Sequence, residues 1–289
     1  KFINSHKSIL GSCVKIEISS KKSPFRFSWA TPKETFISII IPTKDKVDYL
    51  SQCINSIQKH NPGLPYEICL IDNDSKEEKT KLYFKEFLKK DYTNSRKIIK
   101  FSGKFNFSKM NNYAVSKSRG NIIMFVNNDV KFIHENWGYE LASNALRPKI
   151  GFVGCKLYYD DDTIQHAGVV LGIGGIAGHA FKYYYKNDNG YFYRLNSSQE
   201  YSALTAACLA ISKENWNKLK GFDERNLPVN YNDVDICLEA RMIGLRNLFL
   251  PCVEAYHFES RTRGKVEGKK YKLWKKESKF IKNKWSFIL

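Results

Sequence analysis

Between residues 36 and 126 the sequence alternates short apolar segments with segments in which apolar residues recur every three or four positions. The apolar segments at 36–41, 67–71, 98–101 and 122–126 predict buried β-strands. The segments at 47–57, 77–88 and 108–118 predict helices with one apolar face. This alternation is typical of βαβ units, so we expect an α/β fold built on a mostly parallel sheet.

Three of the predicted strands are followed by polar residues. These are Thr43 and Asp45, Asp72 and Asn73, and Asn127, Asn128 and Asp129. Because parallel strands direct their carboxyl ends to one edge of the sheet, we expect these side chains to meet there, where open α/β sheets bind ligands. Carboxylate and amide oxygens suit Mg²⁺ or Mn²⁺, often together with substrate phosphates. The alternative is that they only form turns, where Asn and Asp are common.

The formal net charge of +18 favours anionic partners such as nucleotides, phosphate-bearing lipids, acidic membrane surfaces or nucleic acid. A hydrophobic fraction of 43% excludes a mainly disordered chain. The seven cysteines are scattered and never form a C-x-x-C pair, so we expect reduced core residues in the cytoplasm and no zinc site. We find no signal peptide and no membrane span, although a chain that begins with Lys1 is consistent with a longer polypeptide.

The region after residue 146 contains two patterns that resemble binding motifs. The run Asp160-Asp161-Asp162 is typical of an exposed, solvated turn rather than a metal site. Gly172, Gly174 and Ala177 have the spacing of a dinucleotide-binding motif, but the aromatic segment 181–185 that follows predicts a strand and not the required helix. We interpret the glycines as a tight corner or a loop that approaches substrate closely.

A helix is predicted from residue 232 to Met242, where Gly244 ends it. Free N–H groups at its start would keep Asp233 ionised and able to accept a proton. The alternative is that Asn232 or Asp233 only caps the helix. His257 follows a predicted strand at 248–253 in a polar cluster, where a structural role and a ligand role are both open.

From residue 265 onward the chain is rich in lysine, with aromatic residues interspersed. This composition predicts a basic amphipathic helix that either packs on the domain or lies on an anionic membrane surface.

Seven short motifs occur in one order along the chain: SIIIPT (38–43), IDNDS (71–75), NND (127–129), QHAG (165–168), GFDE (221–224), NDVD (232–235) and HFES (257–260). With these motifs, residues 36–264 resemble the inverting glycosyltransferases of family 2. These have the GT-A fold, and the resemblance is strongest to the branch found in bacterial O-antigen and capsule biosynthesis. This sequence differs from many members of the family, because Asn128 and Asn232 occupy positions where those members have acidic residues.

The resemblance implies metal-dependent transfer of a sugar, with inversion, from a nucleotide-diphosphate donor, with a UDP- or dTDP-sugar favoured. The acceptor would be a hydroxyl of a glycan or polyprenyl-linked saccharide. By the same resemblance, Pro42, Thr43, Asp45, Asp72, Asn73, Asn128 and Arg263 would bind the nucleotide; Asp129 and His257 would hold Mn²⁺ or Mg²⁺; Asp233 would be the general base; and His166, Asn232 and Asp235 would face the acceptor.

We therefore expect an N-terminal extension (1–35), a GT-A domain (36–264) and a basic C-terminal helix (265–289). The domain would comprise a nucleotide-binding half (36–130) and an acceptor half (131–264) with a smaller mixed β region. We expect a cytoplasmic protein in peripheral contact with the inner face of the membrane, and no nucleic-acid partner.

Two other functions are considered as alternatives to the glycosyltransferase, one a different enzyme and one a binding module. One is a sugar-nucleotide-synthesising nucleotidyltransferase, but PTKD (42–45) lacks the glycine-rich loop that such enzymes use for a triphosphate. The other is a non-catalytic nucleotide-, glycan- or nucleic-acid-binding module, for which the sequence offers no zinc finger or helix-turn-helix pattern.

Overall fold

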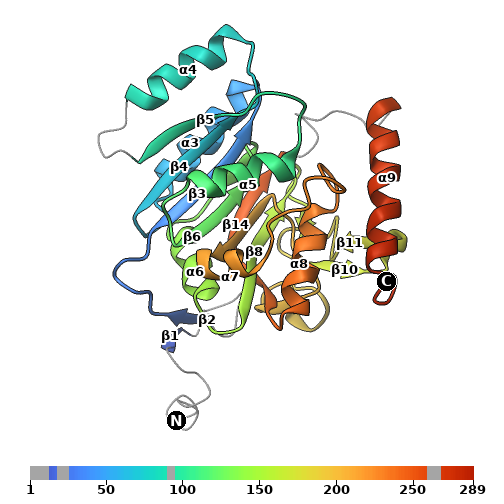
Figure 1. Cartoon of the computed structure of the whole chain (residues 1–289). Helices are drawn as coiled ribbons and strands as arrows, with labels where there is room; N and C mark the ends of the chain where they lie inside the picture. Colours follow the sequence, from blue (N-terminus) through green and yellow to red (C-terminus); the bar gives the residue numbers. More distant parts are fainter. Residues whose placement is uncertain (1–12, 18–25, 90–94, 259–267) are drawn as a thin grey trace.

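A mixed ten-stranded sheet runs through the molecule and carries helices on both faces (Figure 1). The structure is a computed structural model that describes residues 13–17, 26–89, 95–258 and 268–289. The sheet order is β12-β14-β8-β13-β6-β3-β4-β5, with β7 beside β14 and β9 beside β8. Its strands are β3 (Ile37–Thr43), β4 (Tyr66–Asp72), β5 (Arg96–Lys100), β6 (Ile122–Val126), β7 (Val130–Phe132), β8 (Ile150–Tyr158), β9 (Ile164–His166), β12 (Gln199–Tyr201), β13 (Cys208–Ser212) and β14 (Arg246–His257).

The helices are α3 (Val47–Lys59), α4 (Glu78–Lys89), α5 (Phe107–Lys117), α6 (Trp137–Ala145), α7 (Lys213–Lys218), α8 (Asn232–Met242) and α9 (Gly268–Lys284), with short 3₁₀ helices η1 (Ile173–Gly175) and η2 (Tyr191–Tyr193). Two small antiparallel sheets pair β1 (Cys13–Glu17) with β2 (Arg26–Trp29) and β10 (Val169–Leu171) with β11 (Ala177–His179).

The predicted parallel sheet is confirmed for β6, β3, β4 and β5, which are neighbours and run in one direction. The strand β3 continues two residues beyond the predicted segment, so Thr43 pairs with Asp72 at the end of β4. Beyond β6 the sheet becomes mixed, because β13 runs antiparallel between β6 and β8. The chain thus has the predicted smaller mixed β region in its second half.

Alternate residues of the sheet enter two cores, one on each face. Ile39 and Ile41 contact the core under α3, α4 and α6, whereas Ile40 contacts the core under α5, α7 and α8. Both cores include residues from before and after residue 130, so the two proposed halves share one continuous sheet. The extension is attached through Trp29, whose ring centroid lies 4.0 Å from the guanidinium of Arg147.

Segment 181–185 does not form the predicted strand. Phe181 and Tyr183 have φ values of 55° and 68°, which are incompatible with extended backbone, and Tyr183 to Tyr185 are exposed. The predicted glycine corner is confirmed. Gly172 and Gly174 adopt positive φ angles between β10 and β11, and the Gly172 N–H donates to the carbonyl of Ile176.

The described cysteines at 53, 69, 155, 208 and 237 are free thiols and buried, as predicted for core residues, whereas Cys252 is partly exposed. Burial raises the pKa of the Cys69 thiol to about 12. None of the helices in the described ranges is both long enough and apolar enough to cross a membrane.

Candidate functional site

The carboxyl ends of β3, β4 and β6 bring the predicted polar residues to one edge of the sheet. The Asn73 N–H donates to the Thr43 carbonyl over 3.0 Å. The Asn128 amide nitrogen donates to the Thr43 hydroxyl over 3.1 Å, and both side chains are buried. Thr43 therefore links the ends of all three strands, as the parallel sheet predicted.

A carboxylate and an imidazole meet beside this edge. The His257 Nε2 atom lies 3.2 Å from Oδ1 of Asp129, and the side chains of Asp129 and His257 are only 4% and 9% exposed. Tertiary pairing produces this contact, because Val130 of β7 pairs with His257 at the end of β14. The Phe258 N–H also donates to the Asp129 carbonyl, which holds the two chain segments together.

Two neighbours orient the imidazole of His257. Its Nδ1 atom lies 2.7 Å from Oε1 of Gln165, and the Asn127 amide nitrogen lies 3.2 Å from its Nε2 atom. The Gln165 amide oxygen only accepts, so Nδ1 donates to it, and Nε2 is the ring nitrogen that faces Asp129. An imidazole held through Nδ1 by a second partner is oriented to coordinate a metal ion through Nε2.

The chemistry of this donor set fits a divalent ion such as Mn²⁺. One imidazole nitrogen and one carboxylate oxygen are suitable ligands, and their separation of 3.2 Å allows both to reach one ion. The described residues contain no group of three or more His, Cys, Asp or Glu side chains that could hold a metal. Asp129 and His257 would therefore need water or phosphate oxygens to complete the coordination.

The carboxylate of Asp233 lies in the first turn of α8, as predicted. Its Oδ2 atom accepts from the Ala206 N–H over 3.2 Å, and its Oδ1 atom accepts from the Val234 N–H over 2.9 Å. The cap position is Tyr231, with no side-chain cap, so capping does not explain Asn232 or Asp233. Ala207 follows Ala206 in the chain, and its carbonyl accepts from the Asn127 N–H. Asp233 is thereby connected to the residue after β6 through Ala206 and Ala207, which directly precede β13.

The remaining predicted nucleotide ligands occupy different environments. The Asp45 carboxylate accepts from the N–H groups of Lys76 and Glu77, and Asp72 accepts from the Ser75 N–H. The Asn73 side chain is fully buried and donates to the carbonyls of residues 101 and 103, so it holds that loop in place. Pro42 is buried within β3, and Arg263 lies outside the described residues.

Two of the three predicted acceptor residues point elsewhere. Asp235 is 3% exposed, and its carboxylate binds Lys284 and Trp285 of the C-terminal segment, which contradicts a direct acceptor contact. Asn232 is also 3% exposed and donates to the Val229 carbonyl. Asp235 is buried against the C-terminal segment, so the basic helix packs on the domain at this side of α8, one of the two alternatives that its sequence left open.

The third, His166, is buried beside His179, with the two Nδ1 atoms 2.8 Å apart. Burial, together with the nearby histidines 179 and 257, keeps the pKa of His166 well below its usual range, so this side chain is neutral. Sequence reasoning assigned no role to Gln165, which orients His257, although QHAG was among the quoted motifs.

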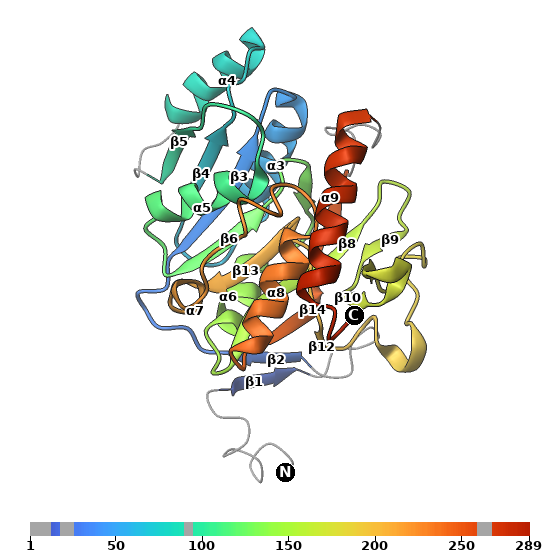
Figure 2. The same ribbon diagram turned by 45° about the vertical axis from the view of Figure 1, so that its right-hand side comes forward.

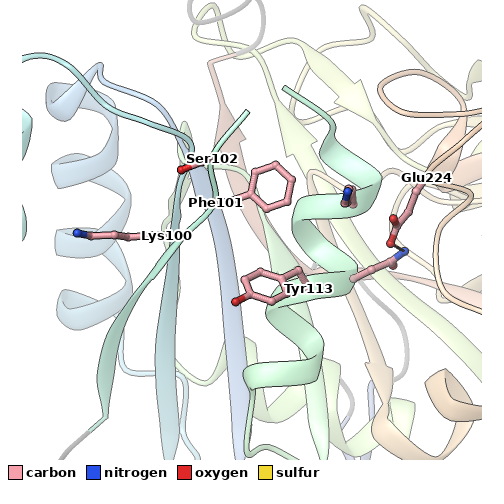
Figure 3. A pocket seen from close by; sticks show the side chains of 7 residues that line it. Lys100, Phe101, Ser102, Tyr113 and Glu224 are labelled. Carbon is pink, nitrogen blue, oxygen red and sulfur yellow. Dashed lines mark hydrogen bonds between the residues drawn. The ribbon is translucent and has the colours of Figure 1, made fainter. Parts of the chain in front are cut away.

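A separate hollow lies between β5 and α5 (Figure 3). It has a volume of about 470 Å³ and is lined by Lys100, Phe101, Ser102, Lys109, Asn112, Tyr113 and Glu224. Phe101 adjoins the predicted nucleotide edge, because its N–H donates to the Asp72 carbonyl. None of the predicted site residues lines this hollow, so it is distinct from the site at the strand ends.

Residues 38–213, more than half of the chain, match the family model for glycosyl transferase family 2. The uncharacterized protein y4gI of Sinorhizobium fredii is 37% identical over 276 residues, which cover 95% of this chain and 30% of that protein. The O-antigen biosynthesis protein RfbC of Myxococcus xanthus is 32% identical over 239 residues, which cover 81% of this chain and 18% of that protein. The chain therefore spans less than a third of the length of these relatives.

Solved structures show the same architecture. GalNAc-T7 with UDP, GalNAc and Mn²⁺ superimposes with a TM-score of 0.65 at 14% identity, covering 86% of this chain and 50% of that one. Mannosyltransferase PcManGT from Pyrobaculum calidifontis, in complex with GDP-Man and Mn²⁺, gives a TM-score of 0.58 at 14% identity, covering 79% and 58% of the two chains. At such low identity the likeness concerns the fold, which is the predicted GT-A fold.

Proposed function

The chain is a glycosyltransferase that belongs to glycosyl transferase family 2, and we propose that it transfers a sugar, with inversion, from a nucleotide-diphosphate donor to a hydroxyl of a glycan or lipid-linked saccharide. The observation that carries this proposal is the convergence of Thr43, Asp129 and His257 at the strand ends, with Asp233 one strand away. Family membership also argues against the nucleotidyltransferase and the non-catalytic binding module.

In this proposal Thr43, Asp45, Asp72 and Asn128 bind the nucleotide, and Asp129 and His257 hold Mn²⁺ or Mg²⁺. The bound ion would neutralise negative charge on the leaving diphosphate. Asp233 accepts the proton of the acceptor hydroxyl as its oxygen attacks the anomeric carbon from the face opposite the diphosphate. The hydrogen bonds from Ala206 and Val234 support this role, because they orient the carboxylate and stabilise its charge.

We place the reaction in surface polysaccharide synthesis, supported by the 32% identity to the O-antigen biosynthesis protein RfbC. The nucleotide base of the donor stays open between uracil and guanine types, since one structural neighbour was solved with UDP and another with GDP-Man. A UDP- or dTDP-sugar remains our expectation from the sequence.

A polyprenyl-linked acceptor would place the enzyme at an anionic membrane surface, and α9 supports this. The helix contains eight lysines, whereas its single acidic residue, Glu277, is fully buried against the domain. Tyr271 and Trp274 stack with ring centroids 5.7 Å apart and are 50% and 36% exposed. Lysines with exposed aromatic residues on one helix favour binding at an anionic lipid interface.

A thermal-shift panel tests the proposed function. The protein is heated with UDP, dTDP, GDP or CDP, each with and without Mn²⁺, because a ligand that binds only the folded state raises the melting temperature. We expect one diphosphate to stabilise the protein in a Mn²⁺-dependent manner. Release of that diphosphate from the matching nucleotide sugar, with a lipid extract of the source cell as acceptor, then measures turnover. A panel without any stabilisation would contradict the proposal.

A further inference from the structure

The basic helix α9 lies beside α8 (Figure 2) and contacts the turn at residues 229 and 230 that leads into it. Asp233 follows this turn, in the first turn of α8. Glu277, in the middle of α9, is completely buried. Its Oε1 atom accepts from the backbone N–H groups of Val229 and Asn230 over 2.8 and 3.2 Å, and its Oε2 atom accepts from the Asn230 side-chain amide. A buried carboxylate with these three donors fixes the start of the turn, because charge-assisted hydrogen bonds are short and directional.

The end of α9 contacts α8 itself, on the other side of Asp233. The Lys284 ammonium lies 2.8 Å from Asp235 and 2.8 Å from Glu239, both on α8. The Trp285 indole N–H donates to the Asp235 carboxylate over 2.8 Å. Burial raises the pKa of Asp235, and Lys284 and Trp285 oppose that shift by stabilising the carboxylate.

The two sets of contacts lie on either side of Asp233. Glu277 holds residues 229 and 230, and Lys284 and Trp285 hold Asp235, so the chain is held by the C-terminal segment both before and after the proposed base. Between them Tyr231 adopts a left-handed backbone with φ 59°, a conformation that an ordinary side chain rarely keeps without outside support. The tyrosine hydroxyl lies 3.4 Å from Ser278 of α9, which adds a third contact.

We propose that α9 is a positioning element of the active site, in which Glu277, Lys284 and Trp285 set the position of the Asp233 carboxylate relative to the strand ends. This inference rests on the proposed function, since it assumes that Asp233 is the base. None of the three side chains needs to touch substrate. Their effect on turnover follows because a misplacement of about 1 Å in a catalytic group can slow a reaction about 100-fold.

The first experiment measures the turn directly by hydrogen exchange in the full chain, without substrate. We expect Glu277→Gln to speed exchange of the backbone amides at 229–235 about tenfold or more, because an uncharged amide with one accepting oxygen replaces a carboxylate that accepts three hydrogen bonds through two oxygens. In the double variant Glu277→Gln/Asn230→Asp the hydrogen bond can re-form with donor and acceptor exchanged, and slow exchange should return. Glu86→Gln, an exposed glutamate of α4, is the matched control.

The second experiment measures nucleoside diphosphate release, corrected for the folded fraction. We expect Glu277→Gln to lower kcat about 10- to 100-fold with an unchanged KM for the nucleotide sugar, and the double variant to recover most of the loss. A purely structural role would lower stability and leave kcat per folded molecule unchanged.

Unchanged exchange at 229–235 in Glu277→Gln would overturn the inference, and so would faster exchange with unchanged kcat. A wild-type protein without turnover would refute the proposed function instead, while the exchange result would still decide whether α9 holds the turn.

Discussion

His257 Nε2 lies 3.2 Å from Asp129 Oδ1, although Asp129 lies in the turn between β6 and β7 and His257 ends β14, far along the sequence. The pairing of β7 with β14 creates this contact at the carboxyl edge of the parallel strands. The contact unites a carboxylate that the sequence placed at a strand end with a histidine whose role the sequence left open.

Removing either member of this pair should abolish the Mn²⁺-dependent part of nucleotide binding. We expect Asp129→Ala and His257→Ala to lose the Mn²⁺-dependent thermal shift, because one remaining ligand holds the ion too weakly. The shift measured with nucleotide alone should persist. His134→Ala, an exposed histidine that contacts Glu254, is the control, and retention of the Mn²⁺ effect in Asp129→Ala would refute the assignment.

The orientation of His257 by Gln165 gives a second prediction. Gln165→Ala removes the acceptor of the Nδ1 proton and should weaken Mn²⁺ affinity about 10- to 100-fold, as loss of a ligand's orienting partner typically does. A Mn²⁺ titration in the presence of the stabilising diphosphate measures the effect. Gln199→Ala, at a partly exposed position in β12, should leave the affinity unchanged.

Asp233→Asn tests the general base. The amide cannot take the acceptor proton, so kcat should fall about 10²- to 10⁴-fold while binding of the nucleotide persists. The diphosphate-release assay and the thermal shift separate these two effects. Near-normal turnover in Asp233→Asn would remove the base role, and Asp188→Asn in an exposed loop serves as the comparison.

The buried carboxylate of Glu67 should make part of the free energy of unfolding depend on pH. Burial raises its pKa, but hydrogen bonds from Arg119, Lys97 and Ser38 outweigh that effect and lower it from 4.5 to about 2. A lowered pKa means that the ionised group stabilises the fold by about 3 kcal/mol above pH 4.5, and that this stabilisation is lost as the pH falls toward 2.

Urea unfolding of the wild type and Glu67→Gln should therefore show a large difference in the free energy of unfolding at neutral pH. The difference should shrink as the pH is lowered below 4.5. A difference that is independent of pH would show that the ionised carboxylate is not the source of the stability.

The lysines of α9 predict binding to anionic vesicles. Replacing Lys269, Lys272 and Lys276 with glutamine should weaken partitioning onto phosphatidylglycerol vesicles about 100-fold, since each lysine near such a surface contributes about 1 kcal/mol. Replacing Lys79, Lys81 and Lys85 of α4 removes the same charge elsewhere and should have little effect. Equal partitioning of both variants and the wild type would contradict membrane contact through α9.

Local patterns in the sequence determined the parallel half of the sheet, its helices and the polar strand ends. Buried strands are short continuous apolar segments and amphipathic helices repeat their apolar residues every 3.6 positions, so each element could be recognised from its own residues. The convergence of Thr43, Asp72 and Asn128 followed from one rule, that neighbouring parallel strands end at the same edge. The strand predicted at 181–185 was wrong, because the backbone conformation of this segment depends on the loop around it and not on its aromatic residues.

Only the tertiary structure decided which distant residues meet. The contact of His257 with Asp129 depends on the register of β14 against β7, and its contact with Gln165 depends on the pairing of β9 with β8 and of β8 with β14, none of which a local period encodes. In the same way, Asp235 is the type of residue that occurs in binding sites, but it is buried by Lys284 and Trp285 of the basic C-terminal segment, whose packing on the domain the sequence left open. Burial and long-range pairing are properties of the packed chain, so the residue types alone could nominate Asp235 for the site and could not exclude it.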